Sequence, residues 1–161
     1  MPENPIRDTT PEAIAQVQRL IQDARFCALA VEHPDTKTPH VTRIALGTTP
    51  NGQPMTLISD LSVHTTALRK NAACGLLIGE PEDKGDPLTH PRVSIQATAS
   101  FISRADAIQK GLRDHYLTTH PKSKLYIDFA DFNFVTFTIQ SADLNGGFGK
   151  AFALHAADLR T

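Results

Sequence analysis

The sequence predicts a mainly β protein in which an antiparallel barrel is flanked by helices. About six or seven apolar segments have the composition of strands, and short turns separate many of them. Helical patterns occur only at the start, in the middle and in the last third of the chain. Strands and helices do not alternate regularly, and no internal repeat is present. These patterns favour an antiparallel barrel over a doubly wound parallel sheet.

The first expected element is a helix. Thr9 and Glu12 have the spacing of a capping box, and Pro11 suits the first helical turn. Apolar residues then recur at helical spacing, at Ala13, Ile14, Val17, Leu20, Ile21 and Ala24. This stripe predicts a face that packs on the core.

Three strands are expected next. The short apolar run 26–31 is typical of a buried strand, and 40–46 follows it after a turn rich in Pro and Asp. Asn51-Gly52 is a strong hairpin signal, so 55–59 is expected to return beside 40–46.

A short helix is predicted over 65–71 and a strand over 75–78. The polar connection 80–91 is long for a compact domain, and loops of this kind are often functional. The alternating segment 92–102 predicts a long strand.

The last third begins with a helix expected over 105–115. A break at 120–123 starts a second short helix. The clearest alternating strand is 132–139, and 152–154 is a candidate for a last short strand. No boundary divides the sequence, so a single domain over 1–161 is expected.

Composition excludes several classes of function. The net charge is −1, and no basic stripe is interleaved with aromatic residues, so nucleic acid is not an expected partner. No apolar run approaches the roughly 20 residues that span a bilayer, and the first residues lack a secretory signal, so a cytoplasmic location is expected. Cys27 and Cys74 fit small core residues in a reducing compartment, although a disulfide between them stays open.

The stretch 59–71 is the most informative part of the chain. It follows a predicted strand and passes through small hydroxyl residues into a short helix. A strand end that brings Ser and Thr hydroxyls, His64 and helix-start N–H groups together suits a phosphate group. Arg43, on a candidate neighbouring strand, would add a bidentate guanidinium contact. The simpler interpretation of Arg43 is an ion pair with an acidic neighbour, and that of His64 is a surface or packing residue.

Other motifs of cofactor and metal sites are absent. The chain has neither a Walker phosphate loop nor the glycine-rich fingerprint of a dinucleotide site, and its histidines lack metal-ligand spacing. The glycine-rich segment 146–149 is either a turn or a place where backbone approaches a ligand closely.

Three segments together carry a family resemblance: 59–68 (SDLSVHTTAL), 85–92 (GDPLTHPR) and 147–151 (GFGKA). They resemble the pyridoxamine 5′-phosphate oxidase-like FMN-binding split-barrel superfamily, and within it the haem-utilisation (HugZ-like) branch without its C-terminal domain. The resemblance runs from about Pro11 to Leu154. It implies a six-stranded antiparallel split barrel, a homodimer, and FMN in two grooves at the subunit interface.

The resemblance also implies a set of cofactor-binding residues. Arg43 matches the basic residue that begins the flavin-contacting strand, and Ser59 matches a strand-end hydroxyl near the phosphate. His64 and Thr65 occupy the place of an Arg-Lys pair in the oxidases. Arg92 falls where those enzymes have a Gln that touches the flavin.

The same strand supplies backbone groups. By its position in the resemblance, the run Ile44, Ala45 and Leu46 would offer N–H and C=O groups to the isoalloxazine ring. No catalytic acid or base is assigned, because hydride or electron transfer by a flavin does not require one.

The departures from the family pattern affect the expected activity. With His64 and Thr65 in place of two cations, less charge is available for a dianionic phosphate, and a protonated His64 would bind it better as pH falls. Thr48 stands where the oxidases have a substrate-contacting Lys, and the chain has no Trp. Oxidation of pyridoxamine phosphate is therefore not the expected reaction.

Three hypotheses follow. The first is an FMN-dependent oxidoreductase of unassigned substrate. The second is a haem-binding or haem-utilisation protein, with His90 and His155 as candidate iron ligands, although the C-terminal domain that supplies a haem ligand in this branch is absent from the 161 residues. The third is a non-enzymatic flavin carrier or sensor. No structural metal is expected.

Overall fold

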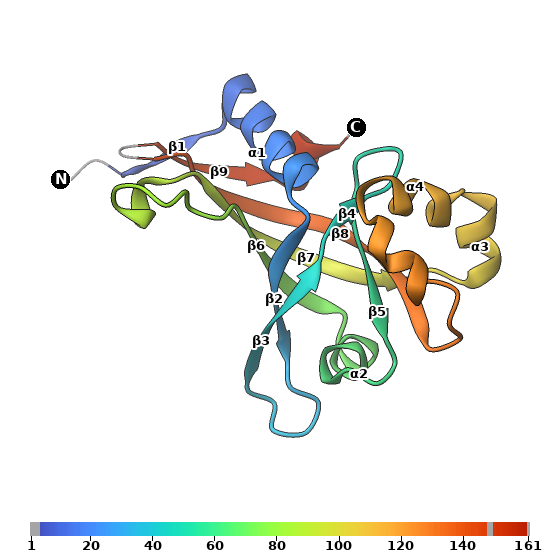
Figure 1. The fold of residues 1–161 in the computed structure, drawn as a ribbon. Helices are drawn as coiled ribbons and strands as arrows, with labels where there is room; N and C mark the ends of the chain where they lie inside the picture. Colours follow the sequence, from blue (N-terminus) through green and yellow to red (C-terminus); the bar gives the residue numbers. More distant parts are fainter. Residues whose placement is uncertain (1–3, 148–149, 161) are drawn as a thin grey trace.

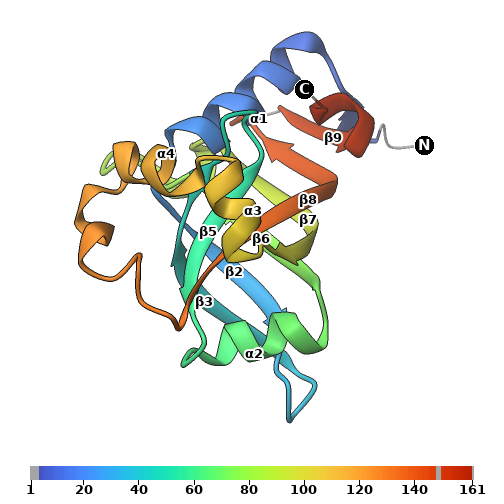
Figure 2. The same ribbon diagram turned by 90° about the vertical axis from the view of Figure 1, so that its right-hand side faces the viewer.

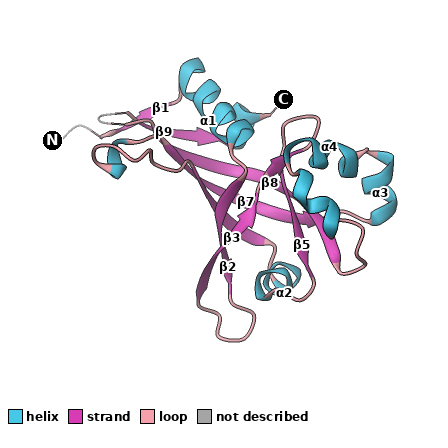
Figure 3. Cartoon of the chain, viewed as in Figure 1, coloured by secondary structure: helices cyan, strands magenta, loops and turns pink. Residues whose placement is uncertain are grey.

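Nine strands of the described part of the chain form one sheet, with helices placed at separate points around it (Figures 1 and 3). The computed structural model describes residues 4–147 and 150–160. The strands are β1 (Ile6–Asp8), β2 (Phe26–Glu32), β3 (Pro39–Ala45), β4 (Gly47–Thr48), β5 (Pro54–Ser59), β6 (Ala73–Ile78), β7 (Arg92–Phe101), β8 (Phe132–Asn145) and β9 (Ala151–His155).

Four α-helices and three 3-10 helices accompany the sheet in the described residues. The α-helices are α1 (Pro11–Asp23), α2 (Val63–Lys70), α3 (Arg104–Gln109) and α4 (Leu112–Thr119), and the 3-10 helices are η1 (Pro87–Thr89), η2 (Pro121–Leu125) and η3 (Ala156–Leu159). A mainly β protein with flanking helices is therefore confirmed.

The sheet differs from the expected six-stranded barrel in strand number and closure. Its order is β1-β9-β8-β7-β6-β2-β3, and β5 pairs with β8 and with β4. The ladder does not close between β3 and β5, although the Thr56 hydroxyl on β5 donates to the Ala45 carbonyl on β3 at 2.6 Å. The strands β1 and β4 are too short to show a period in the sequence, and β1 pairs with β9 in parallel.

Strand β8 extends six residues beyond the predicted end at 139, and a bulge explains why the prediction stopped there. Its first five residues pair with β5 and its last five pair with β9, while β7 follows the other edge. The register with β7 shifts between Gln96 and Ala97, which leaves Gln140 without a directly opposed residue. The predicted strand 132–139 ends at this bulge because the side-chain period breaks there.

The helix boundaries also shift. Thr10 rather than Thr9 caps α1, because its hydroxyl accepts from the Ala13 N–H at 3.1 Å. The helix predicted over 105–115 is divided at Gly111, whose φ of 64° belongs to the left-handed region. Helix α2 begins two residues earlier than the predicted 65.

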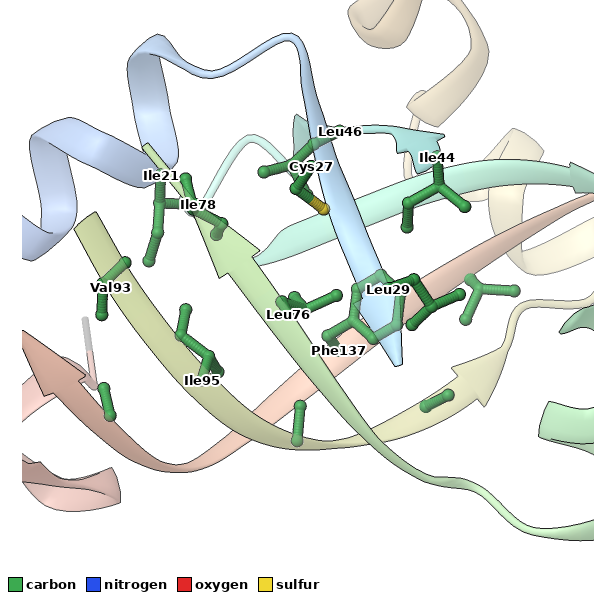
Figure 4. Close-up of a cluster of buried hydrophobic side chains, with 14 of the residues drawn as sticks. Ile21, Cys27, Leu29, Ile44, Leu46, Leu76, Ile78, Val93, Ile95 and Phe137 are labelled. Atoms are coloured by element: carbon green, nitrogen blue, oxygen red, sulfur yellow. The ribbon is translucent and has the colours of Figure 1, made fainter. Parts of the chain in front are cut away.

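The main core fills the inside of the curved sheet. Leu29, Leu76, Ile95 and Phe137, from four neighbouring strands, point toward one another (Figure 4). A second cluster around Met55 and Tyr116 lies under α4. Alternation along β2 explains which residues face inward.

Both cysteines belong to this interior and are free thiols. Burial raises the pKa of Cys27 to about 12 and that of Cys74 to about 11. The expectation of small core residues is confirmed, because Cys27 lies in the core and Cys74 packs against it, and the disulfide left open by the sequence is absent.

Candidate functional site

The turn between β5 and α2 holds the predicted phosphate residues Ser59 and Thr65. The Ser59 hydroxyl donates to Asp131 Oδ2 at 2.7 Å and accepts from the Leu61 N–H at 3.1 Å. The Thr65 side chain is buried, and its hydroxyl donates to the Ser59 carbonyl at 2.6 Å. Both hydroxyls therefore fix the path of the turn. Asp131 immediately precedes β8, and its contact with this turn was not predicted from the sequence.

The groups left available at the turn are those at the start of α2. Ser62 is the N-cap residue, but its side chain makes no capping hydrogen bond. His64 lies in the first turn of the helix and is half-buried. The first N–H groups of a helix attract anions because they lack intrahelical partners.

The surroundings of His64 favour its neutral form. Burial and then the nearby His40 lower its pKa below the usual range. His40 also packs edge-on against His33, with ring centroids 5.8 Å apart. An uncharged imidazole at this place has a weaker attraction for phosphate than the cation it replaces in the resemblance.

A polar network joins the turn to α2 and β8 through Asp60. Arg69 donates to Asp60 Oδ1 at 3.2 Å, and the Asn133 amide donates to the same oxygen at 2.8 Å. The Arg69 guanidinium also lies over the Phe101 ring, 4.1 Å from its centroid. Arg69 is thus occupied by contacts with β7 and β8 and orients the helix.

Arg43 lies on the outward face of β3, with its guanidinium 5.4 Å from the centroid of the Phe26 ring. No carboxylate within the described ranges lies at ion-pair distance from it. The alternative of an acidic partner for Arg43 therefore has no support there. A cation without a counter-ion is free to bind an anionic group.

The surroundings of Arg43 are apolar and exposed. Its register partners across the sheet are Ala28 on β2 and then Leu77 on β6. On this face Phe26 is 41% exposed, Val41 66% and Leu77 47%. Small residues between large exposed ones give a flat apolar surface on β2, β3 and β6, which we call the outer sheet face.

The backbone of Ile44, Ala45 and Leu46 is already engaged in the protein. The Ala45 carbonyl accepts from Thr56, and the Leu46 N–H donates to the Arg25 carbonyl at 2.9 Å. The Ile44 side chain is buried in the core. Flavin contacts by these groups stay a prediction.

Arg92 lies apart from the turn. It opens β7, beside the end of β6, whereas α2 leads into the start of β6. Its guanidinium donates to the Leu88 carbonyl at 3.0 Å and to the His90 carbonyl at 3.5 Å. It thus closes the loop 79–91 on itself, and the structure does not bring it together with Ser59, His64 or Thr65.

The two histidines suggested as iron ligands are also engaged. Nδ1 of His90 accepts from the Glu82 N–H at 3.1 Å, and its Nε2 bonds the Lys84 carbonyl at 2.8 Å. The His155 side chain accepts from the backbone N–H of Asp158 at the start of η3. A haem iron at His90 would have to replace one of its two ring contacts, whereas the single hydrogen bond of the His155 ring leaves its other ring nitrogen available.

Two further expectations concern metals and membranes. Within 4–147 and 150–160, no group of three His, Cys, Asp or Glu side chains is placed to hold a metal ion. None of the helices in those ranges combines the length and apolar character needed to cross a membrane. Of the glycine-rich segment, residues 148 and 149 lie outside the described residues, so a ligand contact there is not tested.

A curated plant protein is similar in sequence to more than half of this chain. It is 35% identical, over 103 residues, to the protein named non-canonical heme oxygenase HOZ, chloroplastic, of Arabidopsis thaliana. The match covers 63% of this chain and 30% of the plant protein, so the chain spans about a third of that relative.

Solved structures share the fold over nearly the whole chain. One is 39% identical with a TM-score of 0.87, covering 96% of this chain and 99% of its own. A heme binding protein from Mycobacterium smegmatis has a TM-score of 0.82 at 21% identity, over 94% of this chain and 61% of its own. Campylobacter jejuni ChuZ has a TM-score of 0.82 at 16% identity, over 94% and 63%. At these last two identities the likeness shows the fold alone.

A family model covers most of the described sheet. The model of the pyridoxamine 5′-phosphate oxidase family matches residues 13–145, from the first turn of α1 to the end of β8. The chain therefore belongs to the pyridoxamine 5′-phosphate oxidase family.

Proposed function

We propose that this protein is a homodimeric, FMN-dependent oxidoreductase. The observation on which the proposal rests is the position of Arg43, a cation without a carboxylate partner on an exposed apolar sheet face. Family membership supports a flavin at such a place. When bound, FMN supplies the hydride or electron transfer, and the protein supplies binding and orientation.

The residues present fit a phosphate and a ring system. The site carries less positive charge than the oxidases, which have an Arg-Lys pair where this chain has His64 and Thr65. Arg43 would hold the phosphate, assisted by the N–H groups at the start of α2 and by His64. Ser59 and Thr65 would shape the turn, because their hydroxyls are bonded to Asp131 and to backbone. Phe26 beside Arg43 adds apolar surface to this face.

The proposed dimer would cover the outer sheet face. Phe26, Val41 and Leu77 would leave water when a second copy packs on them, and burial of apolar area is the main driving force for such association. We expect Leu77→Asp to give a monomer by light scattering and to release FMN. Ile108→Asp, at an exposed apolar residue on α3, is the matched control and leaves the dimer intact. A wild-type monomer would contradict the proposal.

The FMN assignment is tested by titration with FMN, followed by quenching of flavin fluorescence. Arg43→Ala is expected to weaken binding by about 1.5–3 kcal/mol, the range for a hydrogen bond to a charged group. Arg7→Ala, at an exposed arginine on β1, serves as control. Equal affinities for the two variants would remove Arg43 from the site. Bound FMN that neither NADH nor NADPH reduces would favour a carrier or sensor.

Haem binding is the second candidate, because the Arabidopsis relative at 35% identity is named a heme oxygenase. Haem titration followed by absorbance tests it, and a Soret shift at one equivalent supports it. His90→Ala and His155→Ala would show whether either residue binds iron. An unchanged haem spectrum on mixing contradicts this candidate and leaves the first standing.

A further inference from the structure

One large groove of the described residues lies away from every predicted FMN residue. Its volume is about 800 Å³, and α1, the turn before β5, the middle of β8 and η3 form its walls. In Figures 1 and 2, α1, that turn and the C-terminal end lie close together above β8. The volume is in the range of pockets for drug-sized ligands.

The floor of the groove is a strand edge without a partner. Pairing of β8 with β5 ends at Thr136, and pairing with β9 begins at Ser141. Residues 137–140 therefore have no ladder partner on this edge. At about 3.3 Å per residue, the unpaired stretch is roughly 13 Å long.

The direction of the backbone groups follows from two hydrogen bonds. The Phe134 carbonyl accepts from Ile102 on the β7 side, whereas the Phe137 carbonyl accepts from the Gln53 side chain at 3.3 Å on the groove side. Pairing with β7 stays in register from Phe137 to Ile139, before the bulge at Gln140. Alternation from Phe137 therefore turns the N–H and C=O of Ile139 toward the groove. One residue of an added strand could form two hydrogen bonds with this N–H and C=O.

The walls add positive charge without a counter-ion. Arg19 on α1 and Arg160 after η3 line the groove, and no Asp or Glu does. Neither arginine forms an ion pair among the described residues. Gln18, Gln22 and the buried Ile21 on α1 line the groove together with Arg19.

We propose that this groove binds an extended acidic peptide segment of a partner protein, which adds a short strand to β8 between β5 and β9. The peptide backbone pairs with Ile139, and acidic side chains meet Arg19 and Arg160. Exposed strand edges recruit peptides in this way, with affinity from main-chain bonds and selectivity from side chains. This site is independent of the proposed flavin site.

The test uses the full ¹⁵N-labelled chain and the probe acetyl-Glu-Val-Glu-Val-amide. We expect amide shifts at Ile139, Gln140 and Gln18, and weaker binding as salt is raised. The double variant Arg19→Gln, Arg160→Gln is expected to lose about tenfold in affinity, whereas Lys122→Gln, an exposed cation on η2, changes it less than about twofold.

Matched probes separate the strand from a simple anion site. We expect no binding of the lysine counterpart, acetyl-Lys-Val-Lys-Val-amide, because its charge has the opposite sign. We also expect no binding of an N-methylated acidic peptide, because it lacks the backbone donors. Shifts produced equally well by either peptide, or by succinate alone, would overturn the proposal. So would the absence of shifts at these residues with millimolar acidic peptide.

Discussion

The turn 59–65 and the loop 79–91, which Arg92 follows, are stabilised by different kinds of hydrogen bond. In the turn, the Ser59 and Thr65 hydroxyls bond to Asp131 and to partly buried backbone. In the loop, His90 and Arg92 bond carbonyls of the loop itself in an exposed setting. Polar residues that suggest a ligand are in both cases engaged by the protein, but only the turn is joined to the core.

Within the part of the chain that the structure describes, these polar groups of the turn and the loop are hydrogen-bonded, whereas the Arg43 side chain is not. Ser, Thr and His next to a strand end are typical of phosphate sites, and the same groups also satisfy backbone atoms in tight turns. Arg43, in the middle of a strand, has no such local partner. We therefore expect ligand binding at groups without local hydrogen bonds, such as Arg43, rather than at every Ser, Thr or His of the turn.

The largest expected effect is at the base of the loop. Gly79 has φ of 113°, and a Cβ there would lie 2.5 Å from the Pro91 carbonyl oxygen. Gly79→Ala is expected to lower the free energy of unfolding by about 2–4 kcal/mol in urea denaturation. Gly85→Ala, in the same loop with φ of 66° and open space around it, should cost about 1 kcal/mol. Equal losses would mean that the loop base relaxes freely.

The turn is tested with an isosteric change. Thr65→Val keeps the shape of the buried side chain and leaves the Ser59 carbonyl without its donor, so we expect a loss of about 1–3 kcal/mol. Thr66→Val, exposed on the next position of α2, should stay within about 0.5 kcal/mol of wild type. The same denaturation assay measures both, and a neutral Thr65→Val would show that the turn does not depend on this bond.

The pH dependence of folding stability tests the environment of His64. Its pKa in the folded chain is lowered by burial and by His40, so the unfolded chain takes up this proton first as pH falls. Its contribution to stability is therefore complete above about pH 6.5 and is lost as pH falls below that value. His64→Gln should flatten this slope in denaturation curves recorded between neutral and mildly acidic pH.

Bound FMN should reverse the preference of His64. A phosphate dianion favours the imidazolium, so FMN affinity is expected to rise as pH falls, by at most about tenfold per pH unit for one proton. Comparison of wild type with His64→Gln in the same buffers cancels the titration of the phosphate itself. Parallel pH profiles would place the phosphate away from His64.

The smallest expected effect is at His90. His90→Ala removes two bonds that hold the exposed loop together, at Glu82 and Lys84. Because the loop is not part of the core, we expect global stability to change by less than about 1 kcal/mol. Amide exchange over 82–90 should become about tenfold faster in hydrogen–deuterium exchange. Unchanged protection would mean that Arg92 alone maintains the loop.

The sequence alone determined the class of fold and most of its elements. Alternation and helical spacing depend on neighbours along the chain, so β7, α1 and the first half of β8 were predictable from local pattern. The family resemblance, carried by segments such as 59–68, was confirmed by a family model over 13–145.

Tertiary structure alone decided which groups are free to bind. The bond from Ser59 to Asp131 joins residues 72 positions apart, and the unpaired edge of β8 exists only because β5 ends and β9 begins on either side of it. Such pairings depend on register and burial across the sheet, which the local pattern of the chain does not encode. The physical reason is that a hydroxyl or a strand edge can bind a ligand only where the fold has not already satisfied it.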